Sequence, residues 1–189
     1  DCAYDETPPE EWSEGLVGFR PASVFDVSQT EGEPLPELET TATGDAGTLV
    51  TVLEDAASEL DVEVRIVDAD EWIHGQAEGI CKPRQSDEPP LVAVRNRANE
   101  ADLAVTLVHE LAHALLHGAI SDPLARSEQE LEAEAVAYIV GRHYGLDTSN
   151  SSFYLAAWAG DDPEAIRERL SRISRTAEQL IDVVDSETA

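Results

Sequence analysis

The chain has 189 residues, of which 42% are hydrophobic, so it is long enough for one domain with a core and too short for two large ones. Its longest apolar runs, such as residues 135–140, are far shorter than the roughly 18 to 20 residues that cross a bilayer. The first residues (DCAYDETPPEEW) lack the basic and apolar regions of a secretory signal, and no Met is present. We therefore expect a cytoplasmic protein without a membrane span, and we expect the chain to be a piece of a longer one.

The formal net charge is -28, because 40 acidic residues stand against 12 basic ones. Such a surface repels nucleic acid, since binding to phosphates needs clustered Lys and Arg. The arginines at 167–175 alternate with glutamates, which indicates a solvated helix face. We expect nucleic-acid binding only through a domain upstream of this fragment. An acidic excess with Lys82 as the sole lysine suits a protein from concentrated salt. The competing interpretation is that the acidity mimics DNA.

The two cysteines, Cys2 and Cys81, are far apart in the chain. They form neither a CxxC pair nor the spacing of a zinc ribbon. We expect both to be free thiols.

A change of composition near residue 48 divides the chain into two predicted regions. Residues 1–47 are rich in proline and acidic residues and are predicted to be a leader or linker with the remnant of an upstream domain. Residues 48–189 carry regular hydrophobic patterns and are predicted to form the catalytic domain.

The first half of the predicted domain contains one helix and two or three strands. Apolar residues at helical spacing predict a helix over 49–60. Alternating apolar and charged residues predict a half-buried strand over 62–66, and an apolar run predicts another over 91–95. Between them, the glycine-bearing segment 75–83 is predicted to be an edge strand.

The second half is predicted to be helical. Asn99 is a plausible N-cap for a helix that ends at Gly118, and a second helix is predicted over 128–143. The segment 151–160 is predicted to be a short apolar helix or turn. A long amphipathic helix begins near Pro163. Its predicted inward residues are Ile166, Leu170, Ile173, Ala177, Leu180 and Val184.

The motif HELAH gives the strongest chemical signal in the chain. His109 and His113 are four residues apart, so on a helix both imidazoles project from one face and can share a tetrahedral ion. Glu110 is turned away from that pair, so its carboxylate can reach a water at the metal without occupying a coordination position. It is therefore the predicted general base. His117 lies one turn further along and is interpreted as a supporting or structural residue. Three histidines in one row make a metal-free histidine face the weaker interpretation.

A catalytic zinc needs a third protein ligand beside the two imidazoles. The helix predicted over 128–143 offers four glutamates, and their spacing alone leaves the choice open. Glu134 is favoured because mostly small residues follow it along the helix and allow a close approach to the HELAH helix. Glu132 is the runner-up. Glu128 and Glu130 are interpreted as solvated residues at a helix N-terminus.

The segments HELAHALLHG and EAEAVAYIV resemble the ImmA/IrrE-like zincin metallopeptidases, and among them the peptidase half of ArdC-type antirestriction proteins. In that family an EAxxF/Y pattern supplies the third ligand, and in this chain it matches Glu134, Ala135 and Tyr138. Residues 19–36 are similar to the segment that joins an N-terminal DNA-binding domain to the peptidase. The resemblance covers most of residues 16–184. Because most of the DNA-binding domain is missing, DNA binding is not carried over.

The resemblance implies an α+β, minimal zincin-like fold, in which a small mixed sheet packs on the HExxH helix and a glutamate-bearing helix, with further helices at the C-terminus. It also implies that the edge strand within 75–81 pairs with the substrate. The implied activity is that of a zinc endopeptidase with one zinc per chain. Its implied substrate is a cytoplasmic protein, such as a regulator encoded by a mobile element.

In the mechanism that these residues predict, zinc activates a water and polarises the peptide carbonyl, while Glu110 takes the water's proton and passes it to the departing amine. The alternative is an acidic antirestriction or interaction protein whose metal site is structural or non-catalytic. Two imidazoles and a carboxylate also suit manganese, cobalt or iron, so zinc is favoured by the motif alone.

Overall fold

The computed structural model describes residues 41–84, 88–118, 124–148 and 163–188, and in 163–166 only the backbone. All of these residues lie in one unit, Leu38–Ala189. The helix or turn expected at 151–160, Ile166 and Cys2 lie outside what is described. Among the described helices, none is long and apolar enough to cross a membrane.

Three short strands form a mixed sheet in the order β1-β3-β2. These are β1 (Glu63–Val67), β2 (Gly79–Lys82) and β3 (Leu91–Arg95). The pairing of β1 with β3 is parallel, and that of β2 with β3 is antiparallel. The strands predicted from the alternating and apolar patterns are thus confirmed, and β2 lies at an edge of the sheet, as expected.

The register of the sheet directs one face toward the helices. Val64 of β1 and Cys81 of β2 both pair with Val92 of β3, so the three side chains lie on the same face. Val92 is fully buried, and Val64 and Cys81 pack against the same core. The apolar residues of the alternating pattern that predicted the strands therefore lie on this face.

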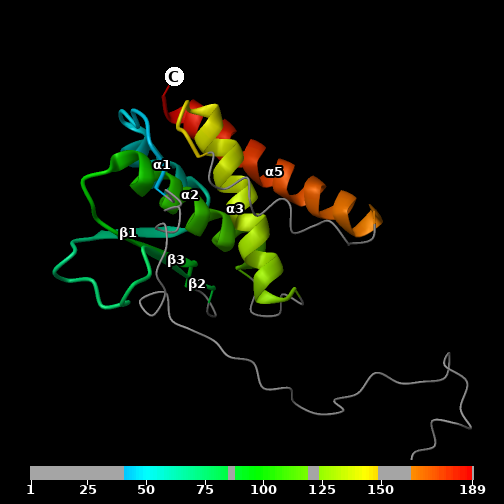
Figure 1. Cartoon of the computed structure of the whole chain (residues 1–189), viewed down its shortest axis with the longest axis horizontal. Helices are drawn as coiled ribbons and strands as arrows, with labels where there is room; N and C mark the ends of the chain where they lie inside the picture. Colours follow the sequence, from blue (N-terminus) through cyan, green and yellow to red (C-terminus); the bar gives the residue numbers. More distant parts are fainter. Residues whose placement is uncertain (1–40, 85–87, 119–123, 149–162, 189) are drawn as a thin grey trace, which may run out of the picture. The chain divides into compact units, whose positions relative to one another are not determined.

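Four helices are described: α1 (Leu49–Glu59), α2 (Glu100–His117), α3 (Arg126–His143) and α5 (Pro163–Glu187). Their positions confirm the four helices expected at these places in the chain. Figure 1 shows α2 between the sheet and α3, and α2 contacts β2, β3 and all three other helices. The expected class, α+β with a small mixed sheet, is therefore present, and the HELAH motif lies on the most central helix.

The beginning of α2 is held by a side-chain cap. Asn99 accepts a hydrogen bond from the backbone N–H of Asp102, 3.2 Å away, and its amide donates to the carbonyl of Ala42. Asp102 in turn accepts from the backbone N–H of Ala42. Further along, Thr43 forms an isolated antiparallel bridge with Asp147. Residues 41–47, which the sequence suggests are part of a linker, thus contact the ends of α2 and α3.

Small side chains let α3 lie close to α2. Ala133 and Ala137 are fully buried, and a Cβ added at Gly141 would lie 2.8 Å from the side chain of Thr148 and 3.4 Å from that of Val105. A larger residue at position 141 would therefore require the side chain of Thr148 to shift. Val105 belongs to α2, so the missing side chain at position 141 gives α2 room at this point of α3.

One predicted inward residue of α5 is wrong. Ile173, Ala177, Leu180 and Val184 are buried as expected, but the side chain of Leu170 is 47% exposed. The residue that reaches α3 at that level is Arg169, which pairs with Glu128. Neighbouring residues on a helix point about 100° apart, so Leu170 is directed away from that contact.

We expect Leu53→Ala to lower the free energy of unfolding by about 2–5 kcal/mol, since the Leu53 side chain is fully buried in the core and its loss leaves a cavity. Denaturant unfolding followed by circular dichroism measures the change. Thr51→Ala, at an exposed position of the same helix, serves as the control and should change it by less than about 0.5 kcal/mol. Equal losses in the two variants would contradict the burial of Leu53.

Candidate metal and catalytic site

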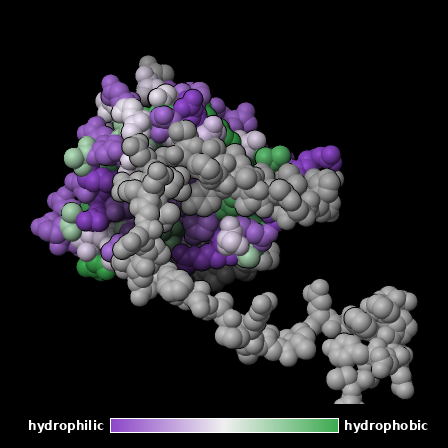
Figure 2. All heavy atoms as spheres, in the orientation of Figure 1, coloured by the Kyte–Doolittle hydropathy of each residue, from purple (hydrophilic) through white to green (hydrophobic). Residues whose placement is uncertain are grey.

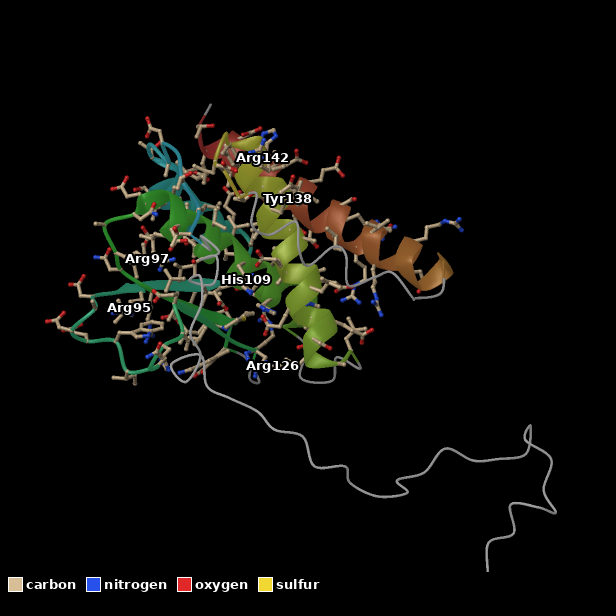
Figure 3. All side chains as sticks on the ribbon, in the orientation of Figure 1. Arg95, Arg97, His109, Arg126, Tyr138 and Arg142 are labelled. Carbon is tan, nitrogen blue, oxygen red and sulfur yellow. The ribbon has the colours of Figure 1, made fainter. Side chains whose placement is uncertain are left out.

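The imidazoles of His109 and His113 converge on one point beside α2. Their ring centroids lie 4.8 Å apart, and their Nε2 atoms are 3.1 Å apart. Figure 3 shows His109 on α2, with Arg126 at the start of α3 and Tyr138 farther along α3. Because residues four apart lie on the same face of a helix, the spacing in HELAH brings the two nitrogen donors together on the side of α2 that meets α3.

The four glutamates of α3 divide between two faces of that helix. Glu130 and Glu134 lie against His109. Glu128 and Glu132 are paired with arginines of α5. Residues four apart share a helix face, whereas residues two apart lie on nearly opposite ones. One face of α3 thus supplies carboxylates to the histidines, and the other supplies carboxylates to α5.

Glu130 completes a triangle of donor atoms with the two imidazoles. Its Oε2 lies 3.4 Å from Nε2 of His109 and 3.4 Å from Nε2 of His113. Around a tetrahedral ion with bonds of about 2.0–2.1 Å, donor atoms are about 3.3 Å apart. These three are also the group of His, Cys, Asp and Glu residues, among those described, whose donor atoms cluster closely enough to hold a metal ion. The donor set and its spacing fit zinc.

Glu134, the ligand expected from the sequence, contacts the other nitrogen of His109. Its Oε2 is 3.1 Å from Nδ1 of His109. When Nδ1–H donates to this carboxylate, Nε2 is left as an acceptor and the ring is held in one orientation. The structure thus places Glu134 beside the donor triangle and Glu130 within it. The identical residue type at i and i+4 is the signal in the sequence that could have pointed to both.

Glu110 lies on the sheet side of α2, against the edge strand β2. Its side chain is largely buried, and a Cβ added at Gly79 of β2 would lie 2.7 Å from both its Cγ and its Oε1. Only glycine at position 79 leaves space for the carboxylate in this position. Glu110 therefore lies outside the donor triangle, and its role as the general base stays a prediction.

Two cavities lie on either side of Glu110. One has a volume of about 270 Å³ and is lined by His109 and Glu134, and the other has a volume of about 450 Å³ and is lined by His113 and Glu130. Both are also lined by Gly79 and Glu110. The carboxylate of Glu110 is thus accessible from both cavities, along the edge strand of the sheet.

The carboxylates around His109 control its charge in the metal-free protein. Burial lowers the pKa of His109, but hydrogen bonds to Glu130 and Glu134 and the charge of Glu110 outweigh it and raise the pKa to about 9. The hydrogen bond from His109 lowers the pKa of Glu130 to about 2. The carboxylates of Glu130 and Glu134 therefore favour a positive charge at this point, which the protonated His109 supplies in the metal-free protein.

Burial has the opposite effects on His113 and Glu110. It lowers the pKa of His113 to about 4, with help from the positive charge of His109, so this imidazole is neutral and ready to donate electrons to a metal. It raises the pKa of Glu110 to about 7, against the opposing charge of His109. A carboxyl with a pKa near neutrality can both accept and release a proton at physiological pH.

Glu132 and His117 form a further contact between α3 and α2, next to the donor triangle. Glu132, the runner-up for the third ligand, is fully buried, and its Oε2 lies 3.6 Å from Nε2 of His117 and 3.3 Å from Nη2 of Arg172. The ring of His117 lies next to that of His113, with centroids 5.5 Å apart. His117 thus has the supporting position that was expected.

Cys81 of β2 is a free thiol as expected, and burial raises its pKa to about 12.

We expect Gly79→Ala to displace the carboxylate of Glu110, because the new methyl group would overlap it. The fold should tolerate the change, since a flexible side chain yields more readily than backbone. Metal content should stay at the wild-type value while turnover falls by at least about tenfold, a loss that costs about 1.4 kcal/mol in the barrier. Metal analysis and a peptidase assay measure the two effects. Thr51→Ala, at an exposed position of α1 and outside both cavities, serves as the control and should change neither quantity.

Residues 57–140 match the family model of the IrrE N-terminal-like domain, Peptidase M78. An uncharacterized protein of Bacillus anthracis is 37% identical over 98 residues, which are 50% of this chain and 17% of that protein. This chain therefore spans a small part of that relative's length. No solved structure matches. The matched segment contains the whole sheet, α2 and the glutamates of α3, so this part of the chain is similar to the IrrE N-terminal-like peptidase domain.

Proposed function

We propose that this protein is a zinc peptidase in which His109, His113 and Glu130 hold the ion. The observation that carries the proposal is the triangle of donor atoms, with sides of 3.1, 3.4 and 3.4 Å. The match to a peptidase family over the same residues supports peptide hydrolysis as the reaction. A zinc ion bound there would polarise a peptide carbonyl and acidify a water molecule.

The residues around the triangle have separate tasks in this proposal. Glu134 accepts from Nδ1–H of His109, so that Nε2 of that ring points to the ion. Glu110 takes a proton from the attacking water on its carboxylate and delivers it to the nitrogen of the departing amine.

The substrate in this proposal is an extended peptide or protein segment. The edge strand β2 can pair with such a segment by strand addition, and the two cavities beside Glu110 have room for side chains before and after the cleaved bond. The resemblance to ArdC-type proteins adds the finer proposal that the substrate is a cytoplasmic regulator encoded by a mobile element.

The choice between Glu130 and Glu134 as ligand is tested by metal content. We expect one zinc per chain in the wild type, and loss of zinc in His113→Ala and Glu130→Gln. Glu134→Gln should keep the ion with an affinity about 10- to 100-fold weaker, as is usual when a group that orients a ligand is changed. Plasma emission spectrometry and chelator competition in high-salt buffer measure both quantities.

Glu128→Gln is the matched control, because this residue of α3 pairs with Arg169 on the side of the helix that meets α5. It should bind zinc as the wild type does. If Glu134→Gln loses zinc and Glu130→Gln retains it fully, the third ligand is Glu134 and the assignment to Glu130 is wrong. A wild type that binds no metal would overturn the enzyme proposal.

We expect Glu110→Gln to lower turnover by about 10²–10⁴-fold, because the amide cannot accept the water's proton. Zinc content should be unchanged, since Glu110 lies outside the donor triangle. Cleavage of a mixed peptide library, followed by mass spectrometry, measures turnover. Full activity in this variant would contradict the role of Glu110, and a parallel loss of zinc would show that it holds the ion.

A further inference from the structure

We propose that Arg172 of α5 is a positioning residue that holds the two helices of the metal site at their correct separation. Its guanidinium reaches both of them. Nη2 lies 3.3 Å from Oε2 of Glu132 on α3, and it donates to the carbonyl of Leu116 in the last turn of α2, also at 3.3 Å. The inference rests on the proposed metal site and adds a residue far from it in sequence.

The first step of the argument is the burial of Glu132. This side chain is fully buried, yet it carries a carboxylate. An ionised carboxylate in the interior is costly unless a cation and hydrogen-bond donors accompany it. Arg172 supplies the cation, and its own side chain stays 38% exposed, so it retains part of its hydration. The contact with Arg172 is therefore what keeps this part of α3 in its buried position.

The second step is the position of Glu132 within α3. It lies between Glu130 and Glu134, which face the histidines, and points to the other side of the helix. A rotation of α3 that moves Glu132 toward water must also move Glu130 and Glu134. Since ligand distances in a metal site vary by only about 0.2 Å, a small rotation is enough to disturb the donor triangle.

The third step concerns α2. Leu116 follows His113 by three residues, so the carbonyl that accepts from Arg172 lies about one turn from a donor of the triangle. His117 also lies between the two sets of groups, with its Nε2 3.6 Å from Glu132 and its ring beside that of His113. Arg172 thus contacts both helices that carry the metal donors, α3 through Glu132 and α2 through the carbonyl of Leu116.

The test compares four forms of the full chain: wild type, Arg172→Gln, the double variant Glu132→Gln/Arg172→Gln, and Arg175→Gln. Arg175 is an exposed arginine on the same helix and is the matched control. The single variant leaves a carboxylate buried without its arginine and can fail to fold. The double variant removes both charges, so it tests positioning in a protein that is free of that penalty.

Three quantities are measured on each form: the thermal unfolding midpoint of the metal-free protein, zinc affinity by chelator competition, and the visible absorption spectrum with Co²⁺ in place of zinc. We expect the double variant to regain a near-wild-type midpoint, to bind zinc about tenfold more weakly and to show a shifted Co²⁺ spectrum. Arg175→Gln should match the wild type in all three.

A folded double variant with wild-type zinc affinity and an unchanged Co²⁺ spectrum overturns the inference, because Arg172 would then serve stability alone. If the double variant also fails to fold, Arg172→Lys decides. It keeps the charge, but its ammonium ends one bond short of the position of Nη2, the atom that makes both contacts. Weaker zinc binding therefore supports the inference, and unchanged binding overturns it. A wild type without metal affinity overturns the proposed function itself, which is a separate result.

Discussion

The close contact between α2 and α3 is the arrangement on which the rest of the site depends. Ala133 and Ala137 of α3 are fully buried, and a Cβ added at Gly141 would lie 3.4 Å from the side chain of Val105 on α2. Because the two helices lie close together, the side chain of Glu130 on α3 reaches the imidazoles of His109 and His113 on α2. The two distances of 3.4 Å from Oε2 of Glu130 to the imidazoles depend on it, whereas the 3.1 Å between the two imidazoles is set within α2.

Charge on α3 is distributed in a way that serves both stability and the site. The chain has 12 basic residues for 40 acidic ones, and the visible surface of the described part is largely hydrophilic (Figure 2). Exposed pairs such as Arg65 with Glu63 add little to stability. Arg169 and Arg172 have more effect because they meet acidic groups of α3 where that helix is covered. Two of the scarce cations thus pair with one face of α3, while the carboxylates of the other face lie beside the imidazoles and Arg126.

Burial also separates the roles of the two groups that follow one another in the motif. His109 has two carboxylates beside it, whereas Glu110 points to the glycine of β2, where no side chain competes for space. The pKa of Glu110 is raised by that burial to about 7. The helix turns about 100° between them, and that turn is sufficient to direct the His109 side chain to α3 and the Glu110 side chain to β2.

Hydrophobic periodicity and local motifs determined much of this protein by themselves. They predicted the four described helices and three strands, the Asn99 cap and the donor pair of HELAH, because these depend on residues close together in the chain. Three features depended on contacts between distant segments instead. Leu170 is exposed because Arg169 occupies the contact with α3. Glu132 is buried because Arg172 of α5 accompanies it. The choice among the α3 glutamates was open for the same reason: all four fit a helix equally well, and only the rotation of α3 against α2 brings Glu130 to the imidazoles and Glu134 to the far side of one ring.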